Sequence, residues 1–221
     1  MLRDIRCLGE KYPPALDALQ DLRDEGEQSI LAGMVDDTTL KEVVALNDVL
    51  DTVRRSLDLL DKLRFMGARF DPHRRTLTRL MTDTLRTLGR YDELSSIVET
   101  LVLRVATDSF LSEFIRVQPI QGLSKTQNDA VVRYHHRSLV SDGLMAYETL
   151  LFTRKLPPAV EIEERLLNLD RTPRMYALLV QSALVVKAAI HAQVVIRKAN
   201  HRLSPQDRRL FQTYMAHRHG R

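Results

Sequence analysis

Residues 39–66, with the sequence TLKEVVALNDVLDTVRRSLDLLDKLRFM, are the stretch from which the fold of this chain is predicted. Its apolar residues recur at alternating spacings of three and four, at Val43, Leu46, Leu50, Val53, Leu57 and Leu60. This heptad spacing keeps one apolar stripe against a partner helix along its whole length. We expect one continuous helix over 39–66 that packs within a bundle of the same chain, and an intermolecular coiled coil is the alternative.

Helix start and stop signals elsewhere in the chain predict seven further helices. Ser124 with Gln127 has the form of a capping box, as does Thr39 with Glu42, and Asp71, Thr172 and Ser204 each precede a proline. Glycines at 33, 67, 89 and 122 fall where helices are expected to stop. The expected helices cover residues 14–32, 39–66, 72–88, 91–116, 125–154, 158–169, 173–199 and 205–217.

The composition agrees with a helical fold, because the chain is 44% hydrophobic and only 5% aromatic, and no segment alternates with period two. We therefore expect an all-α protein, a compact bundle of about seven or eight helices. Apolar residues surround the whole circumference of the helix near 173–199, so this helix should lie at the centre. We expect one domain over 1–221, with a possible subdivision near 118–122, and a basic C-terminal segment over 200–221.

Positive charge is concentrated in two segments. Residues 63–90 carry 7 Lys or Arg against 2 acids, and residues 197–221 carry 7 against 1. Such segments can bind the phosphates of a nucleic acid or an acidic partner surface. The residues predicted to make these contacts are Arg74, Arg75, Arg79, Arg86, Arg197, Lys198, Arg202, Arg208 and Arg209. Alternatively, the arginines of 72–88 are simply solvated or pair with the acidic helix over 39–66.

Catalytic and metal-binding motifs are not found in the sequence: there is no phosphate-binding glycine loop, H-E-x-x-H, C-x-x-C or G-x-S-x-G. His135 and His136 are adjacent, so on a helix they point about 100° apart. His217 and His219 would mainly add positive charge, and Cys7 has no neighbouring His to act as its base. We expect no enzyme activity, no cofactor and no metal, and a small-molecule ligand is not favoured.

Lys187 and His191 lie four residues apart in the most apolar part of the chain, where burial of either would be costly. They should face water, lie at an interface or pair with acids. An enzyme or ligand carrier with a pocket around this pair is a third hypothesis, which carboxylates converging from other helices would favour. The nearby Glu161, Glu163 and Glu164 are interpreted as charges that favour a helix N-terminus.

A single cysteine, Cys7, excludes an intramolecular disulfide and favours a cytoplasmic protein. Lys187 and His191 argue against a membrane span over 175–196, and no export signal is predicted. We expect a non-enzymatic interaction protein that assembles with itself or a protein partner through the apolar faces of 39–66 and 173–199. The alternative is a nucleic-acid-associated accessory or packaging protein that grips phosphates through 72–90 and 197–221.

Overall fold

A computed structural model of the chain describes residues 12–34, 36–118 and 120–216. These residues form helices and no strand, which confirms the predicted all-α class. The helices are more numerous than the expected seven or eight. They group into two compact units, Met1–Leu88 and Gly89–Arg221, whereas the subdivision considered near 118–122 falls inside the second unit. None of the described helices is both long and apolar enough to cross a membrane.

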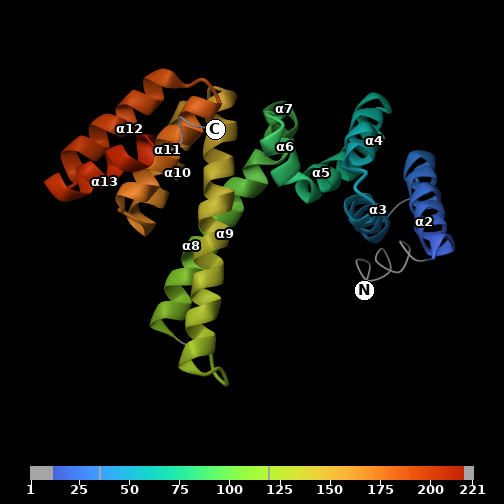
Figure 1. The fold of residues 1–221 in the computed structure, drawn as a ribbon, viewed down its shortest axis with the longest axis horizontal. Helices are drawn as coiled ribbons and strands as arrows, with labels where there is room; N and C mark the ends of the chain where they lie inside the picture. The colour runs from blue at the N-terminus through green and yellow to red at the C-terminus, as the bar shows by residue number, and fades with distance from the viewer. Residues whose placement is uncertain (1–11, 35, 119, 217–221) are drawn as a thin grey trace. The chain divides into compact units, whose positions relative to one another are not determined.

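The first unit contains α2 (Pro13–Ala32), α3 (Asp37–Val49), α4 (Val53–Phe65), α5 (Asp71–Leu80), α6 (Thr82–Thr87) and a 3-10 turn, η1 (Ala68–Phe70) (Figure 1). Helix α3 packs against α2, α4 and α5. Apolar side chains from all four of these helices are buried, among them Ile30, Leu40, Val43, Leu60 and Leu77.

The predicted continuous helix over 39–66 is wrong, because a turn separates α3 from α4. Asp51 adopts a left-handed backbone, with φ 54°, and the Thr52 N–H donates to the Asn47 carbonyl over 2.7 Å. The Asn47 side chain reinforces this stop, since its Oδ1 accepts from Thr52 Oγ1 and its Nδ2 donates to Ser56 Oγ. The buried Asn47, next to the seam residue Leu46, thus fixes the turn between α3 and α4 through polar contacts.

The six predicted seam residues fall into two groups by burial. Val43, Leu46 and Leu60 are buried in the first unit, in agreement with intramolecular packing. Leu50, Val53 and Leu57 remain partly exposed.

Two further left-handed residues end helices in the same way. Lys155 N donates to Leu150 O beside Arg154, and Ala188 N donates to Ala183 O beside Lys187, each over 2.8 Å. Lys187 thereby divides the predicted helix 173–199 into α11 (Pro173–Val185) and α12 (Ala189–Arg202).

Two more predicted helices are interrupted. The segment 72–88 forms α5 and α6, and 91–116 forms α7 (Tyr91–Leu94), η2 (Ser95–Ile97) and α8 (Val98–Val117).

The second unit also contains α9 (Lys125–Phe152), α10 (Leu156–Leu169) and α13 (Pro205–Ala216). Helix α11 packs against α9, α10, α12 and α13, so this part of the predicted apolar helix is central within its unit. The expected capping box at Ser124 and Gln127 begins α9. Gly143 permits close packing of α9 on α10, because a Cβ there would lie 2.7 Å from Leu166 Cδ2.

Helix α9 has two different halves. Residues 143–151 are all buried, whereas among residues 125–138 only Asn128 is buried. The first half pairs with α8, and the two helices extend away from α10 to α13 (Figure 1). We call residues 98–138, which are α8, the following connection and the first half of α9, the arm.

Candidate functional site

An ionic cluster joins α10 to α12. Glu163 is fully buried; its Oε2 lies 2.7 Å from His191 Nε2, and its Oε1 accepts from Lys198 Nζ over 2.6 Å. Glu164 accepts from the same Lys198 Nζ over 2.7 Å and from Arg202 Nη1 over 3.1 Å. These five residues form the ionic cluster. The three basic residues share one face of α12 because they are separated by seven and four positions.

The carboxylates of this cluster are held in the ionised form. Burial raises the pKa of the Glu163 carboxyl, but hydrogen bonds and positive charge from His191 and Lys198 outweigh it and lower that pKa below its ordinary value. The hydrogen bond from Lys198 is the main cause that lowers the pKa of Glu164, with a further contribution from Arg202. An ionised carboxylate can only accept hydrogen bonds, so the proton between Glu163 and His191 resides on Nε2.

Two buried groups of α9 adjoin the cluster. The Tyr147 ring lies 5.7 Å from that of His191, and burial is the main cause that raises the pKa of its phenol, so Tyr147 stays neutral. The neighbouring Glu148 accepts from Ser182 Oγ over 2.6 Å and from Tyr91 Oη over 3.0 Å. These contacts join α7, α9 and α11 through polar groups that are already paired, which is typical of structural cross-links.

The structure separates Lys187 from His191. Lys187 is exposed in the turn before α12, whereas His191 pairs with an acid, one of the three predicted outcomes. The interpretation of Glu163 as a charge at a helix N-terminus is wrong, since α10 begins at Leu156 and Glu163 lies buried further along it. The sequence did contain a signal for this pairing: a double glutamate on one helix and three basic residues on one face of another.

The predicted polyanion contacts have different environments. Lys198 and Arg202 are engaged by Glu163 and Glu164, and Arg74 lies 3.3 Å from Asp71. The remaining six fall on both units: Arg75 and Arg79 are exposed on α5, Arg86 is half-buried on α6, Arg197 is exposed on α12, and Arg208 and Arg209 lie on α13, the second of them exposed. Full engagement of the predicted basic set would therefore require breaking ion pairs that hold α12 to α10.

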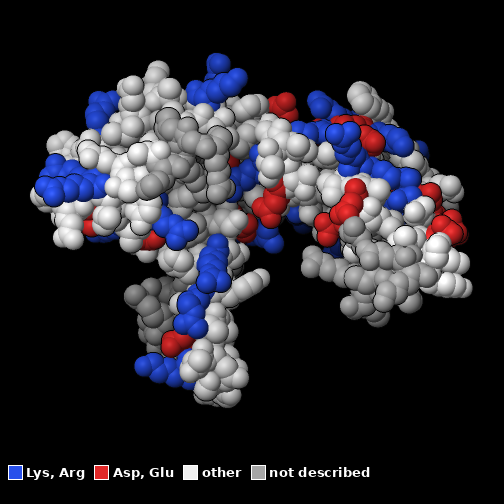
Figure 2. Space-filling view, in the orientation of Figure 1, with Lys and Arg blue, Asp and Glu red and all other residues white. Residues whose placement is uncertain are grey.

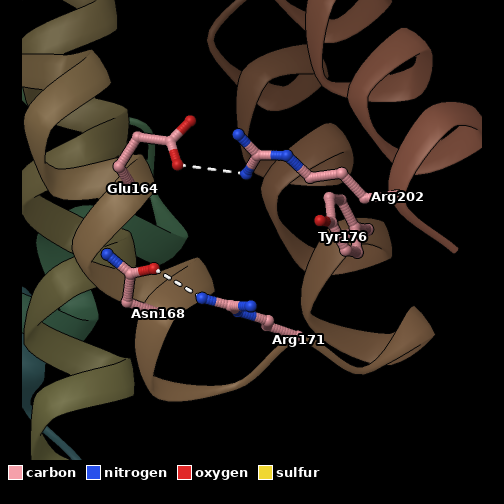
Figure 3. A pocket seen from close by; sticks show the side chains of 5 residues that line it. All are labelled: Glu164, Asn168, Arg171, Tyr176 and Arg202. Atoms are coloured by element: carbon pink, nitrogen blue, oxygen red, sulfur yellow. Dashed lines mark hydrogen bonds and ion pairs between the residues drawn. The ribbon is translucent and has the colours of Figure 1, made fainter.

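An open polar pocket of about 430 Å³ lies beside the ionic cluster (Figure 3). Its walls are Glu164, Asn168, Arg171, Tyr176 and Arg202. Arg171 Nη2 donates to Asn168 Oδ1 over 3.2 Å at one side, and Arg202 meets Glu164 at the other. Figure 3 shows the Tyr176 hydroxyl directed into the space between these two pairs.

The arm exposes large apolar side chains. Leu103 and Phe110 on α8 are 66% and 69% exposed, and Tyr134 on α9 is 70% exposed. A shallow depression of about 320 Å³ lies between the two helices and is lined in part by Leu103, Arg104 and Tyr134. Figure 2 shows Lys and Arg side chains following the arm, where Lys125, Arg133 and Arg137 of α9 are exposed.

The first unit has a smaller apolar surface of its own. Val53 and Leu57, two of the predicted seam residues, line an open groove of about 430 Å³ together with Leu88. Thr84 and Thr87 of α6 form part of its opposite wall. The groove shows that part of the predicted seam faces outward.

No group of three His, Cys, Asp or Glu side chains suited to a metal ion occurs among the described residues. Cys7, His217 and His219 lie outside those residues. No protein-family profile matches the chain, and neither the curated proteins nor the solved structures include one with detectable similarity to it.

Proposed function

We propose that this chain is a non-enzymatic helical interaction protein that assembles through the exposed apolar face of its arm. The observation that carries the proposal is the exposure of Leu103 and Tyr134, which line one depression between two adjacent helices. Burying one such side chain contributes about 1.5–3 kcal/mol, and contiguous exposed apolar side chains on a protein surface are typical of interaction sites. An apolar stripe on a helix is buried by packing against another element, and a further helical layer can provide this for the arm.

This location differs from the faces that the sequence favoured. Val43, Leu46 and Leu60 of 39–66 pack inside the first unit, and most apolar residues of α11 pack inside the second. The arm is the better candidate because its apolar side chains are exposed on two paired helices.

The properties of the arm favour a second copy of the chain as its partner. Residues 98–138 contain five Lys or Arg and four Asp or Glu, so net repulsion between two arms is small. Two helix pairs packed face to face make a four-helix bundle, in which side chains such as Leu103 and Tyr134 can interdigitate.

Light scattering coupled to size exclusion tests the proposal over a range of protein concentrations. Leu103→Gln with Tyr134→Gln keeps the helix-forming tendency at 103 and removes apolar surface from the arm. Leu210→Gln is the matched control, since Leu210 is also exposed but lies on α13. We expect the wild type and the control to assemble and the double variant to dissociate at least tenfold more readily. A wild-type monomer at about 100 μM, or a double variant that assembles normally, rejects self-assembly through the arm.

Nucleic-acid binding is the second candidate, supported by the exposure of Arg75 and Arg79 one turn apart on α5. These side chains could bind consecutive phosphates, and the affinity would fall steeply with salt. The engagement of Lys198 and Arg202 by acids weakens the contribution of the second basic segment. Loss of salt-dependent binding to a labelled DNA duplex in Arg75→Glu with Arg79→Glu would support this function, and unchanged binding would remove α5 from it.

A further inference from the structure

We propose that the polar pocket beside the ionic cluster binds a small organic anion through its carboxylate or phosphate group. Arg171 and Arg202 would hold the anionic group, and Tyr176 would donate a further hydrogen bond. This site lies among α10, α11 and α12, apart from the apolar side chains of the arm on which the proposed function rests.

The balance of charge around the pocket favours an anion. Lys198 and Arg202 together offset the two negative charges of Glu163 and Glu164. Arg171 then remains as an additional positive charge. Among the described residues, its guanidinium donates to the neutral amide of Asn168. The adjacent Asp170 does not line the pocket, and its Oδ1 accepts from the Thr172 N–H over 2.9 Å just before α11.

The donors available in the pocket suit a planar or tetrahedral oxyanion. A guanidinium presents five N–H donors in a fixed fork, and Arg171 uses one of them on Asn168. Arg202 uses Nη1 on Glu164, and hydrogen bonds to Glu164 and Tyr176 raise the pKa of its guanidinium, which keeps it charged. Tyr176 is buried by packing yet lines the pocket, and its hydroxyl lies between Arg171 and Arg202 (Figure 3).

Glu164 is the one acidic wall of the pocket, and its repulsion of an anion is reduced by two cations. Lys198 and Arg202 each donate to a different oxygen of this carboxylate. The volume of about 430 Å³ lies within the range of small-molecule sites. Size and polarity therefore favour a small anion over an apolar ligand or a folded partner.

Thermal unfolding in the presence of sodium phosphate or sodium acetate tests the site, with sodium chloride added to keep the ionic strength constant. Arg171→Gln removes the additional charge while keeping a long polar side chain. Arg174→Gln is the matched control, because Arg174 is an exposed arginine on the same helix as Tyr176 but does not line the pocket.

We expect the melting temperature of the wild type and of Arg174→Gln to rise with the concentration of at least one of the two anions. The dissociation constant obtained by calorimetry should increase at least tenfold in Arg171→Gln. The anion that binds more tightly identifies the group that the pocket prefers. A wild type that responds to neither anion overturns the proposal, as does an equal response of Arg171→Gln and the wild type. Either result leaves assembly through the arm untouched, so the two proposals can fail separately.

Discussion

The two ends of helix α9 differ in what surrounds them and in how they are fixed. At Ser124 the helix begins with a capping box, and the half that follows is largely exposed on the arm. At Arg154 it ends on a left-handed residue, after a half that is buried beside Tyr147 and Glu148. One helix thus serves both as a packed core element and as an exposed support.

The difference shows where stability and recognition can be separated in this unit. The buried half contacts the ionic cluster through Tyr147 and contains Glu148, which binds Ser182 of α11. A change of one charge there disturbs several helices. The exposed half carries Tyr134 and basic side chains, where changes should alter binding more than folding. Substitutions in the buried half should therefore lower stability, whereas substitutions in the exposed half should mainly weaken binding.

The largest effect is expected for Glu163→Ala. Removal of this buried carboxylate leaves His191 without its acid and Lys198 with Glu164 alone. Loss of one partner of a buried ion pair typically costs about 3–5 kcal/mol of unfolding free energy. Urea unfolding followed by circular dichroism measures this loss.

Glu161→Ala on the same helix is the control for that experiment. Glu161 is exposed and pairs with Arg165 at four residues' distance, an interaction worth about 0.3–0.5 kcal/mol. If both alanine variants lose stability equally, the buried cluster does not hold α10 against α12 as inferred.

Lowering the pH should also weaken the ionic cluster, with a smaller loss of unfolding free energy. The fold lowers the pKa of Glu163 below its ordinary value of 4.5, so the stabilisation it provides is fully present above that pH. As the pH falls from about 4.5 through the folded-state pKa, the unfolded chain takes up the proton first. The resulting loss is at most about 1.4 kcal/mol per pH unit for this one group.

Urea unfolding of the wild type and Glu163→Gln between pH 7 and pH 3 measures that contribution. We expect the stability of the variant to fall less steeply below pH 4.5. Parallel curves for the two proteins would show that Glu163 does not titrate differently in the folded state.

Local sequence signals marked the start of α9, and the predicted end at 154 lies only two residues beyond the observed Phe152, although no glycine stops the helix there. The Ser124 box depends on residues three positions apart, and prolines likewise marked the starts of α11 and α13. Asp51, Arg154 and Lys187 adopt left-handed backbones without glycine, so the usual signal for a helix stop was missing. For this reason, the helices predicted over 39–66 and 173–199 were too long.

The candidate sites depended on contacts between residues distant in the sequence. Composition and apolar spacing were enough for the all-α class, because they report burial along each helix. The pairing of Glu163 with His191 spans 28 residues, and no periodicity within a single helix can specify it. The exposed apolar side chains of the arm were missed for a related reason: the sequence analysis placed the interaction faces on 39–66 and 173–199, and spacing alone does not reveal that Leu103 and Tyr134 are exposed.

The smallest effect is expected from Arg154→Gly, at the buried end of α9. A left-handed backbone costs a non-glycine residue about 1–2 kcal/mol, and glycine avoids that cost but loses about 0.5–1 kcal/mol through the entropy of the unfolded chain. We therefore expect Arg154→Gly to raise the unfolding free energy by up to about 1 kcal/mol in urea. Arg137→Gly is the matched control, since Arg137 is an exposed arginine within α9 where glycine should cost about 1 kcal/mol. Opposite signs for the same substitution would establish that Arg154 is left-handed; a loss in both variants would show that α9 continues past this residue.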